Sequence, residues 1–309
     1  MEKDIKKVLL EDLKDIIGFD TPFESSQFSK LVDEDLLYSD LTNTEANLLS
    51  ILKRIDSGEL KKASQDRFND WSDGWNENLI EYKETGQQES LIPKYFRDFG
   101  ICRFQDKYIR AESPVFVYRV INILRTYIFS KYFKDVSKIY EIGCGTGHHL
   151  LRLSELFPNK SLCGLDWTET SSQIIQEINK NNSTNIEYGI FDFNSPDYSL
   201  DVPDGSAILT FGALEQIGHN HDKYFSWIFD KNPEIIVNIE GFNELYDQNI
   251  MSHYLAHKYH KIRGYLDGYL NYIEKLEEKG LVTIIDKYHV KFGNQYDDSS
   301  SYVVWRINK

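Results

Sequence analysis

The chain has 309 residues, of which 41% are hydrophobic and 27% charged, so it is long enough for two domains or one large domain with a cap. Its 49 acidic and 35 basic residues give a net charge of -14, which repels a phosphate backbone and disfavours nucleic acid as a partner. The three cysteines, Cys102, Cys144 and Cys163, have no CxxC spacing, which argues against a disulfide framework, a zinc finger or an iron-sulfur cluster.

The sequence also lacks membrane signals. No segment reaches the roughly 20 apolar residues of a transmembrane helix, and residues 1–14 lack the apolar stretch of a signal peptide. We therefore expect a cytoplasmic protein without a membrane partner. The sequence does not indicate an oligomeric state.

Residues 1–134 are predicted to form a helical N-terminal cap. Apolar residues at helical spacing predict one amphipathic helix at the start of the chain: Ile5, Leu9, Leu13 and Ile16. A second helix is predicted to begin at Thr42, where Thr42 and Glu45 have the spacing of a capping box, and to end at Gly58.

The second half of this cap, residues 67–132, is rich in aromatic side chains. These side chains either pack the core between the cap and the next domain or form a lid over a substrate. Arg103 and Arg110 lie in the same stretch. They either form surface ion pairs or meet an anionic group of a substrate.

From residue 135 to 309, short apolar runs alternate with helical segments, which is the pattern of a parallel sheet covered on both faces. The expected strands are Ile139–Ile142, Ser161–Leu165, Ile186–Ile190, Ala207–Phe211 and Ile235–Ile239. Helices are expected to begin near His148, Thr170, Asp222 and Asn249. The last two segments, Val282–Phe292 and Ser301–Ile307, are predicted to pair as an antiparallel hairpin.

One motif carries chemistry: the stretch KIYEIGCGTG at residues 138–147. An apolar strand is followed by Gly143, Gly145 and Gly147 and then by a helical segment. Glycines at such a turn let the backbone approach a ligand closely, and the helix N-terminus favours a negative group. The spacing is GxGxG and not the dinucleotide fingerprint GxGxxG, because His148 stands at the sixth position.

The motif EIGCGTG resembles motif I of the class I S-adenosylmethionine-dependent methyltransferases, and the resemblance covers the chain from about Lys138 to Trp305. It implies a Rossmann-like α/β fold with a mostly parallel seven-stranded sheet and an antiparallel last strand. It also implies S-adenosyl-L-methionine as the cofactor, bound by residues 135–309 beneath the cap or substrate lid of residues 1–134.

The same resemblance implies roles for individual residues. Asp166 would accept hydrogen bonds from the ribose hydroxyls, since a carboxylate accepts two such bonds and its charge strengthens them. Trp167 and Phe193 would pack near the adenine, and Asp192 would bind its amino group. The remaining cofactor-binding candidates lie in the glycine motif and after the fourth strand: Glu141, Gly143, Gly145, Gly147, Phe211 and Gly212, with Ala213 and Glu215 beside them.

The acceptor is expected to be a small molecule, because the sequence lacks the NPPY or DPPY motif and the Pro-Cys nucleophile of nucleic-acid methyltransferases. A weaker resemblance, in IPKYFRDFG and in the Tyr/His-rich segment after the fifth strand, is to sugar O-methyltransferases of bacterial surface-polysaccharide pathways. It implies a sugar or nucleotide sugar as acceptor. The alternatives are N- or C-methylation of a small metabolite, or a SAM-binding partner protein without turnover.

An aliphatic hydroxyl acceptor requires a base, and histidines are the natural candidates. His219 and His257 are the predicted bases, with Glu240 as an orienting carboxylate at the carboxyl edge of the sheet. The alternative is that His219 is an ordinary solvated loop residue. His253, His257 and His260 are displaced from the apolar stripe that runs from Leu255 to Ile273, so they are either solvated or line the cleft. No metal site is predicted, since the glutamate of HExxH and an evident third ligand are lacking.

Overall fold

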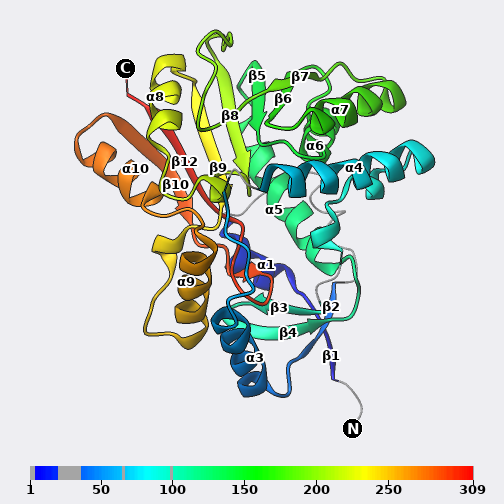
Figure 1. The fold of residues 1–309 in the computed structure, drawn as a ribbon, viewed down its shortest axis with the longest axis vertical. Helices are drawn as coiled ribbons and strands as arrows, with labels where there is room; N and C mark the ends of the chain where they lie inside the picture. Colours follow the sequence, from blue (N-terminus) through cyan, green and yellow to red (C-terminus); the bar gives the residue numbers. More distant parts are fainter. Residues whose placement is uncertain (1–3, 20–35, 65–66, 98–99, 309) are drawn as a thin grey trace.

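The structure is a computed structural model that describes residues 4–19, 36–64, 67–97 and 100–308 (Figure 1). The described residues form two β-sheets. The larger has seven strands in the order β10-β12-β9-β8-β5-β6-β7, and the smaller has five in the order β1-β2-β4-β3-β11. Among the described helices, none is long and apolar enough to cross a membrane.

The seven-stranded sheet confirms the predicted fold class. Its strands are β5 (Lys138–Ile142), β6 (Ser161–Asp166), β7 (Glu187–Ile190), β8 (Ser206–Phe211), β9 (Ile235–Glu240), β10 (Val282–Tyr288) and β12 (Ser301–Ile307). β5 to β9 pair in parallel, and β12 runs antiparallel to both β9 and β10. Every residue of β8 is buried, as expected for a parallel strand covered on both faces.

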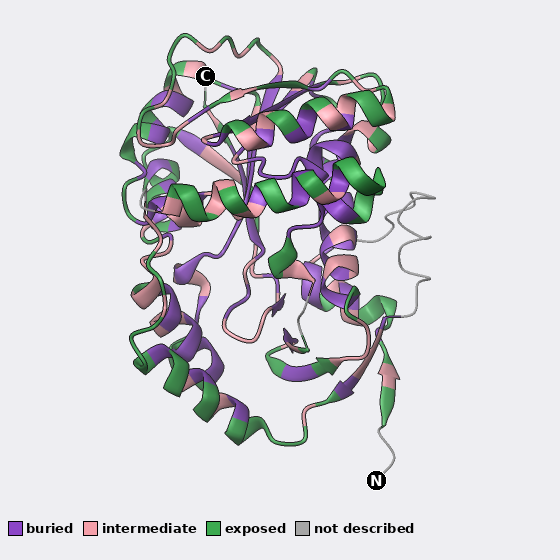
Figure 2. Cartoon of the chain, turned by 45° about the vertical axis from the view of Figure 1, so that its right-hand side comes forward, coloured by how far each residue is buried: buried purple, intermediate pink, exposed green. Residues whose placement is uncertain are grey.

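Helices cover this sheet and the smaller one. They are α1 (Leu10–Ile17), α3 (Thr44–Asp56), α4 (Phe68–Thr85), α5 (Phe116–Tyr132), α6 (His148–Leu156), α7 (Glu169–Asn182), α8 (Asp222–Lys231), α9 (Met251–Arg263) and α10 (Tyr269–Glu278). α4 buries Trp75, Leu79 and Tyr82 at helical spacing and exposes its opposite face (Figure 2). It lies beside α7, where the hydroxyls of Ser72 and Thr170 are 3.3 Å apart.

The cap differs from the predicted helical domain because it contains most of the smaller sheet. The cap contributes four strands to the smaller sheet: β1 (Ile5–Lys7), β2 (Leu37–Asp40), β3 (Ile101–Phe104) and β4 (Lys107–Ala111). The fifth strand of that sheet is β11 (Phe292–Gly293). The prediction of one helix from Ile5 to Ile16 is wrong, because β1 pairs with β2 and the helix begins only at Leu10. The boundary at residues 134 and 135 stays a prediction.

Two other segments depart from the sequence prediction. β10 ends at Tyr288, and Phe292–Gly293 pairs with β3 instead of extending the hairpin with β12. The helix expected from Asn249 through Ile273 is interrupted at Gly264 and Gly268, whose φ angles of 65° and 76° are left-handed. α9 therefore ends at Arg263, and the chain turns there toward the sheet.

Candidate active site

A cavity of about 540 Å³ lies at the carboxyl ends of the parallel strands, where open α/β sheets bind ligands. We call its two parts the sheet end and the loop end. The sheet end is lined by Gly143, Gly145, Asp166, Trp167, Asp192, Phe193, Phe211 and Gly212. The loop end is lined by Glu215, Gln216, Tyr259, Arg263, Tyr265, Asn294, Tyr296, Asp297, Ser299 and Ser300. Trp71, Trp75 and Tyr95 of the cap also line the cavity.

The glycine loop after β5 forms the floor of the sheet end. Gly143 and Gly145 have φ angles of 78° and 51°, which favour glycine. A Cβ atom on Gly143 would lie 2.3 Å from the Cβ of Ala213, and one on Gly145 would lie 2.9 Å from the indole of Trp75. Gly147 does not line the cavity and serves as the N-cap of α6. The loop therefore needs glycine both for its backbone and for its close contacts.

Asp166 is the last residue of β6, and its carboxylate is held by neighbouring groups. Oδ1 accepts hydrogen bonds from the backbone N–H and the hydroxyl of Thr168, at 2.9 and 2.8 Å. Oδ2 accepts the N–H of Gly145 at 3.0 Å. Burial raises the pKa of Asp166, although these hydrogen bonds oppose that shift. Because a carboxylate has about four lone-pair sites, Asp166 retains capacity to accept further hydroxyl groups from a ligand.

Aromatic rings and a second carboxylate, Asp192, also line the sheet end. Trp167 meets Phe68 of α4 edge to face at 5.6 Å, and Phe193 packs on Tyr224 at 5.1 Å. Asp192 uses Oδ1 to accept the N–H of Asn194 at 2.8 Å. This arrangement of flat apolar faces and a carboxylate fits a purine ring with an amino group.

Two further residues predicted to bind the cofactor, Glu141 and Gly212, differ in their access to the cavity. Glu141 does not line the cavity, but both of its carboxyl oxygens are buried and lack a hydrogen-bond partner among the described residues. Burial raises the pKa of Glu141 well above its usual value, which favours its neutral form. A Cβ atom on Gly212 would meet nothing within 4 Å, so the backbone there stays open to a ligand.

The sequence prediction missed His148 and His149, which also line the cavity. His149 stacks on Phe211 at 4.2 Å with an interplanar angle of 9°. Burial lowers the pKa of both imidazoles well below the usual value, so they are neutral near pH 7. The sequence did contain a signal for them, because both residues directly follow the glycine loop and therefore stand in the first turn of α6, which faces the cavity.

Two carboxyl groups follow β8 and β9 near the loop end. Glu240 is fully buried, and its Oε1 accepts the N–H groups of Ala213 and Leu214, both at 3.2 Å. Burial raises the pKa of Glu240 to about 7. Glu215 lines the cavity, and burial together with the charge of Glu240 raises its pKa to about 8. Both groups therefore exchange protons close to neutral pH.

The predicted histidine bases do not line this cavity. His219 is exposed, and His257 is half-buried on α9. Burial lowers the pKa of His257. Their proposed role as bases stays a prediction.

The two flanking histidines were placed wrongly by the sequence analysis. His253 and His260 are neither solvated nor part of the cavity lining, since both are buried. Their Nε2 atoms contact carboxylates, with Asp106 at 3.1 Å and Asp297 at 2.9 Å.

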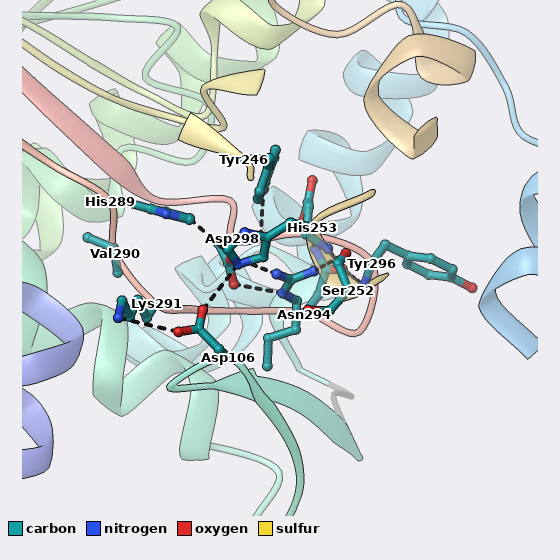
Figure 3. A network of polar contacts seen from close by, with 12 residues as sticks. Asp106, Tyr246, Ser252, His253, His289, Val290, Lys291, Asn294, Tyr296 and Asp298 are labelled. Carbon is teal, nitrogen blue, oxygen red and sulfur yellow. Dashed lines mark hydrogen bonds and ion pairs between the residues drawn. The ribbon is translucent and has the colours of Figure 1, made fainter. Parts of the chain in front are cut away.

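A buried ion pair holds the loop that forms much of the loop end (Figure 3). Arg103 is 1% exposed, and its Nε and Nη2 donate to the two carboxylate oxygens of Asp298 at 2.8 and 2.9 Å. Its Nη1 donates to the carbonyl of Ser252 on α9 at 2.9 Å. Arg103 is thus neither a surface ion pair nor a cavity residue, and Arg110, which is exposed, does not line the cavity either.

Comparison with known proteins agrees with this geometry. Residues 139–230 match a family model described as a methyltransferase domain. No match was found among curated proteins.

Three similar solved structures illustrate the range of the fold. Magnesium protoporphyrin IX methyltransferase from Synechocystis PCC 6803 is 10% identical, with 62% of this chain and 83% of that chain covered and a TM-score of 0.45. The N-terminal domain of EvdMO1 is 17% identical, with 60% of this chain and 81% of that chain covered and a TM-score of 0.39. The 16S rRNA methylase ArmA is 15% identical, with 76% of this chain and 98% of that chain covered and a TM-score of 0.45. At this identity and TM-score, the likeness carries no conclusion on function.

The family match covers the glycine loop and the strand that ends in Asp166. The cavity beside them offers the carboxylates, aromatic rings and open backbone that the cofactor requires. The chain therefore carries a class I methyltransferase domain whose cofactor is S-adenosylmethionine.

Proposed function

We propose that the protein methylates a hydroxyl group of a small molecule, with a sugar or nucleotide sugar as the favoured acceptor. The observation that carries the proposal is the composition of the loop end. Its phenol, hydroxyl, amide and carboxyl side chains lie beside aromatic faces, such as the stacked rings of Tyr259 and Tyr296 at 4.9 Å. Such a surface provides donors and acceptors for a ligand that carries several hydroxyl groups.

The cap supports a small acceptor over a macromolecule. Trp71 and Trp75 of α4 pack 5.2 Å apart, and both line the cavity. The indole of Trp75 lies directly against Gly145. A net charge of -14 opposes the binding of a nucleic-acid backbone.

We propose that Glu215 accepts the proton of the acceptor hydroxyl. When bound, S-adenosylmethionine supplies the electrophilic methyl group. Glu215 lines the cavity two residues after Ala213, which contacts the glycine loop. Glu240 holds this segment by accepting the N–H groups of Ala213 and Leu214, so it acts as a positioning residue. A base with a pKa near the working pH is the most effective proton acceptor.

Other functions remain as competing hypotheses. N-methylation of an amine needs alignment more than a base, so it would leave Glu215 without a catalytic role. His219 and His257 would need to move into the cavity to act on the acceptor, because neither lines it. A binding protein without turnover would retain cofactor affinity and transfer no methyl group.

The experiment is a methyl-transfer screen with labelled S-adenosylmethionine against saccharides, nucleotide sugars, phenols and amines. We expect transfer to a saccharide hydroxyl, with rates that rise as the pH approaches about 8, the pKa of Glu215. The matched control is Glu278→Gln on the exposed face of α10, which should leave the rate unchanged. Transfer only to amines, or equal rates in Glu215→Gln, would contradict the proposal.

A further inference from the structure

Arg263 is a cation at the loop end with few partners. It is the last residue of α9 and lines the cavity. Its Nη2 donates to the hydroxyl of Tyr265 at 2.8 Å, and its guanidinium carbon lies 4.9 Å from the ring centre of Tyr265. Its Nε is buried and has no hydrogen-bond partner within the part of the chain that the structure describes. The guanidinium is therefore oriented by aromatic rings but left with unused donors.

Arg103 can be compared with Arg263, because it is a buried arginine of the same fold whose guanidinium is fully paired. Its guanidinium donates to both carboxylate oxygens of Asp298 and to one backbone carbonyl. Arg263 has a single neutral partner, and none of the described carboxylates lies within ion-pair distance of it. A buried donor without a partner is costly, so a ligand that supplies an acceptor would be bound at Arg263.

The carboxyl groups near Arg263 do not neutralise it. Asp297 is in contact with His260 and accepts a hydrogen bond from Asn294. Glu215 accepts a hydrogen bond from Gln216 at 2.8 Å. Burial and the charge of Glu240 raise the pKa of Glu215 to about 8; the charge of Arg263 opposes this shift, but the two side chains do not form an ion pair. The positive charge of Arg263 is thus available to a ligand.

A second arginine lines the same cavity. Arg67 lines the cavity with its guanidinium carbon 4.9 Å from the ring centre of Trp71. Its contacts to Asp70 and Gln216 are long, both at 3.5 Å. The backbone hydrogen bond from Ala63 to the carbonyl of Arg263, 2.6 Å long, ties the segment before Arg67 to the end of α9.

We propose that Arg263, in the cavity that Arg67 also lines, binds an anionic oxygen group of the acceptor, either a carboxylate on a sugar ring or a phosphate. Arginine suits both groups because its planar fork matches two oxygens at once. The inference rests on the proposed small-molecule function and narrows its substrate class to acidic acceptors.

The test uses the full chain saturated with S-adenosylhomocysteine in phosphate-free chloride buffer. Binding of D-glucose, D-glucuronate and D-glucose 6-phosphate is measured by ligand-observed NMR. We expect an anionic sugar to bind about 10- to 100-fold more tightly than glucose, and Arg263→Gln to abolish this preference. Glucuronate would identify a carboxylate site, and glucose 6-phosphate a phosphate site.

The controls separate this inference from the proposed function. Arg306→Gln, at an exposed position of β12, should keep the preference, and Arg263→Lys should keep part of it because the charge remains. If Arg263→Gln binds S-adenosylhomocysteine with undiminished affinity, the variant is folded. Equal binding of all three sugars, failure of both anions to bind, or an unchanged preference in Arg263→Gln would overturn the inference. Loss of S-adenosylhomocysteine binding by the wild-type protein would instead refute the proposed function.

Discussion

The two ends of the cavity hold their polar groups in different ways. At the sheet end, Asp166 is fixed by the N–H groups of Gly145 and Thr168, all within the turns that follow β5 and β6. At the loop end, Glu215, Arg263 and Tyr296 come from three separate segments and depend on side-chain contacts. The polar groups of the sheet end are thus held by the turns of the sheet itself, while those of the loop end depend on side chains from segments that are distant in the sequence.

The ends also differ in electrostatics. Hydrogen bonds to Asp166 counteract the effect of burial on its pKa. Burial and the charge of Glu240 raise the pKa of Glu215 to about 8, and its hydrogen bond from Gln216 opposes that shift only in part. Burial raises the pKa of Glu240 to about 7 although several hydrogen bonds oppose that shift. The sheet end therefore presents an anchored acceptor of hydrogen bonds, whereas the loop end holds groups that gain and lose protons near neutrality.

The largest expected effect concerns the loop end. Glu215→Gln removes the proposed base while keeping the size of the side chain, so turnover on the identified acceptor should fall by about 10²- to 10⁴-fold. The affinity for S-adenosylhomocysteine should stay nearly unchanged. Steady-state kinetics and calorimetry check this. If His219→Ala or His257→Ala caused the large loss instead, the base would be that histidine.

A second prediction compares the two arginines by stability. Arg103→Met removes the arginine from the buried Asp298 carboxylate and leaves it only the contact with His289 at 3.2 Å, which should lower the free energy of unfolding by about 3 to 5 kcal/mol. Arg263→Met removes no counter-ion contact and should cost less than about 1 kcal/mol. Urea unfolding of both variants gives the difference. Similar losses in the two variants would show that Arg263 has a structural role comparable to that of Arg103.

A smaller effect follows from the raised pKa of Glu215. Between about pH 5 and 8, the unfolded chain releases this proton while the folded protein keeps it, so the free energy of unfolding should fall as the pH rises. Glu215→Gln should reduce this fall by on the order of 1 kcal/mol, an amount that allows for partial solvent exposure of the group. Thermal unfolding at several pH values, with Glu278→Gln as the control, measures it. Parallel curves for the wild type and Glu215→Gln would show that Glu215 titrates normally.

The sheet end could be predicted from the sequence because its signal is local. The glycine loop follows β5, Asp166 is the last residue of β6, and Asp192 comes shortly after β7, so their order along the chain already indicates their place at one edge of the sheet. The parallel sheet followed from the alternation of strands and helices, and the antiparallel β12 followed from the hairpin predicted at the end of the chain and from the family resemblance.

The loop end could not be predicted because its contacts are distant in the sequence. Helical spacing placed His253 and His260 on one face of α9 but could not reveal what covers that face. Asp106, which contacts His253, is 147 residues away, and Asp297 is 37 residues from His260. Arg103 likewise pairs with Asp298 across 195 residues, so its burial was not visible in the local pattern.

The most direct test of the account is calorimetric titration of S-adenosylhomocysteine into the wild type, Asp166→Ala and Arg263→Gln. The account predicts that Asp166→Ala weakens binding by about 1.5 to 3 kcal/mol, the scale for losing hydrogen bonds to a charged group. Arg263→Gln should bind with the wild-type affinity, since Arg263 belongs to the loop end. Undiminished binding by Asp166→Ala, or equal losses in the two variants, would contradict the assignment of the cofactor to the sheet end and the acceptor to the loop end.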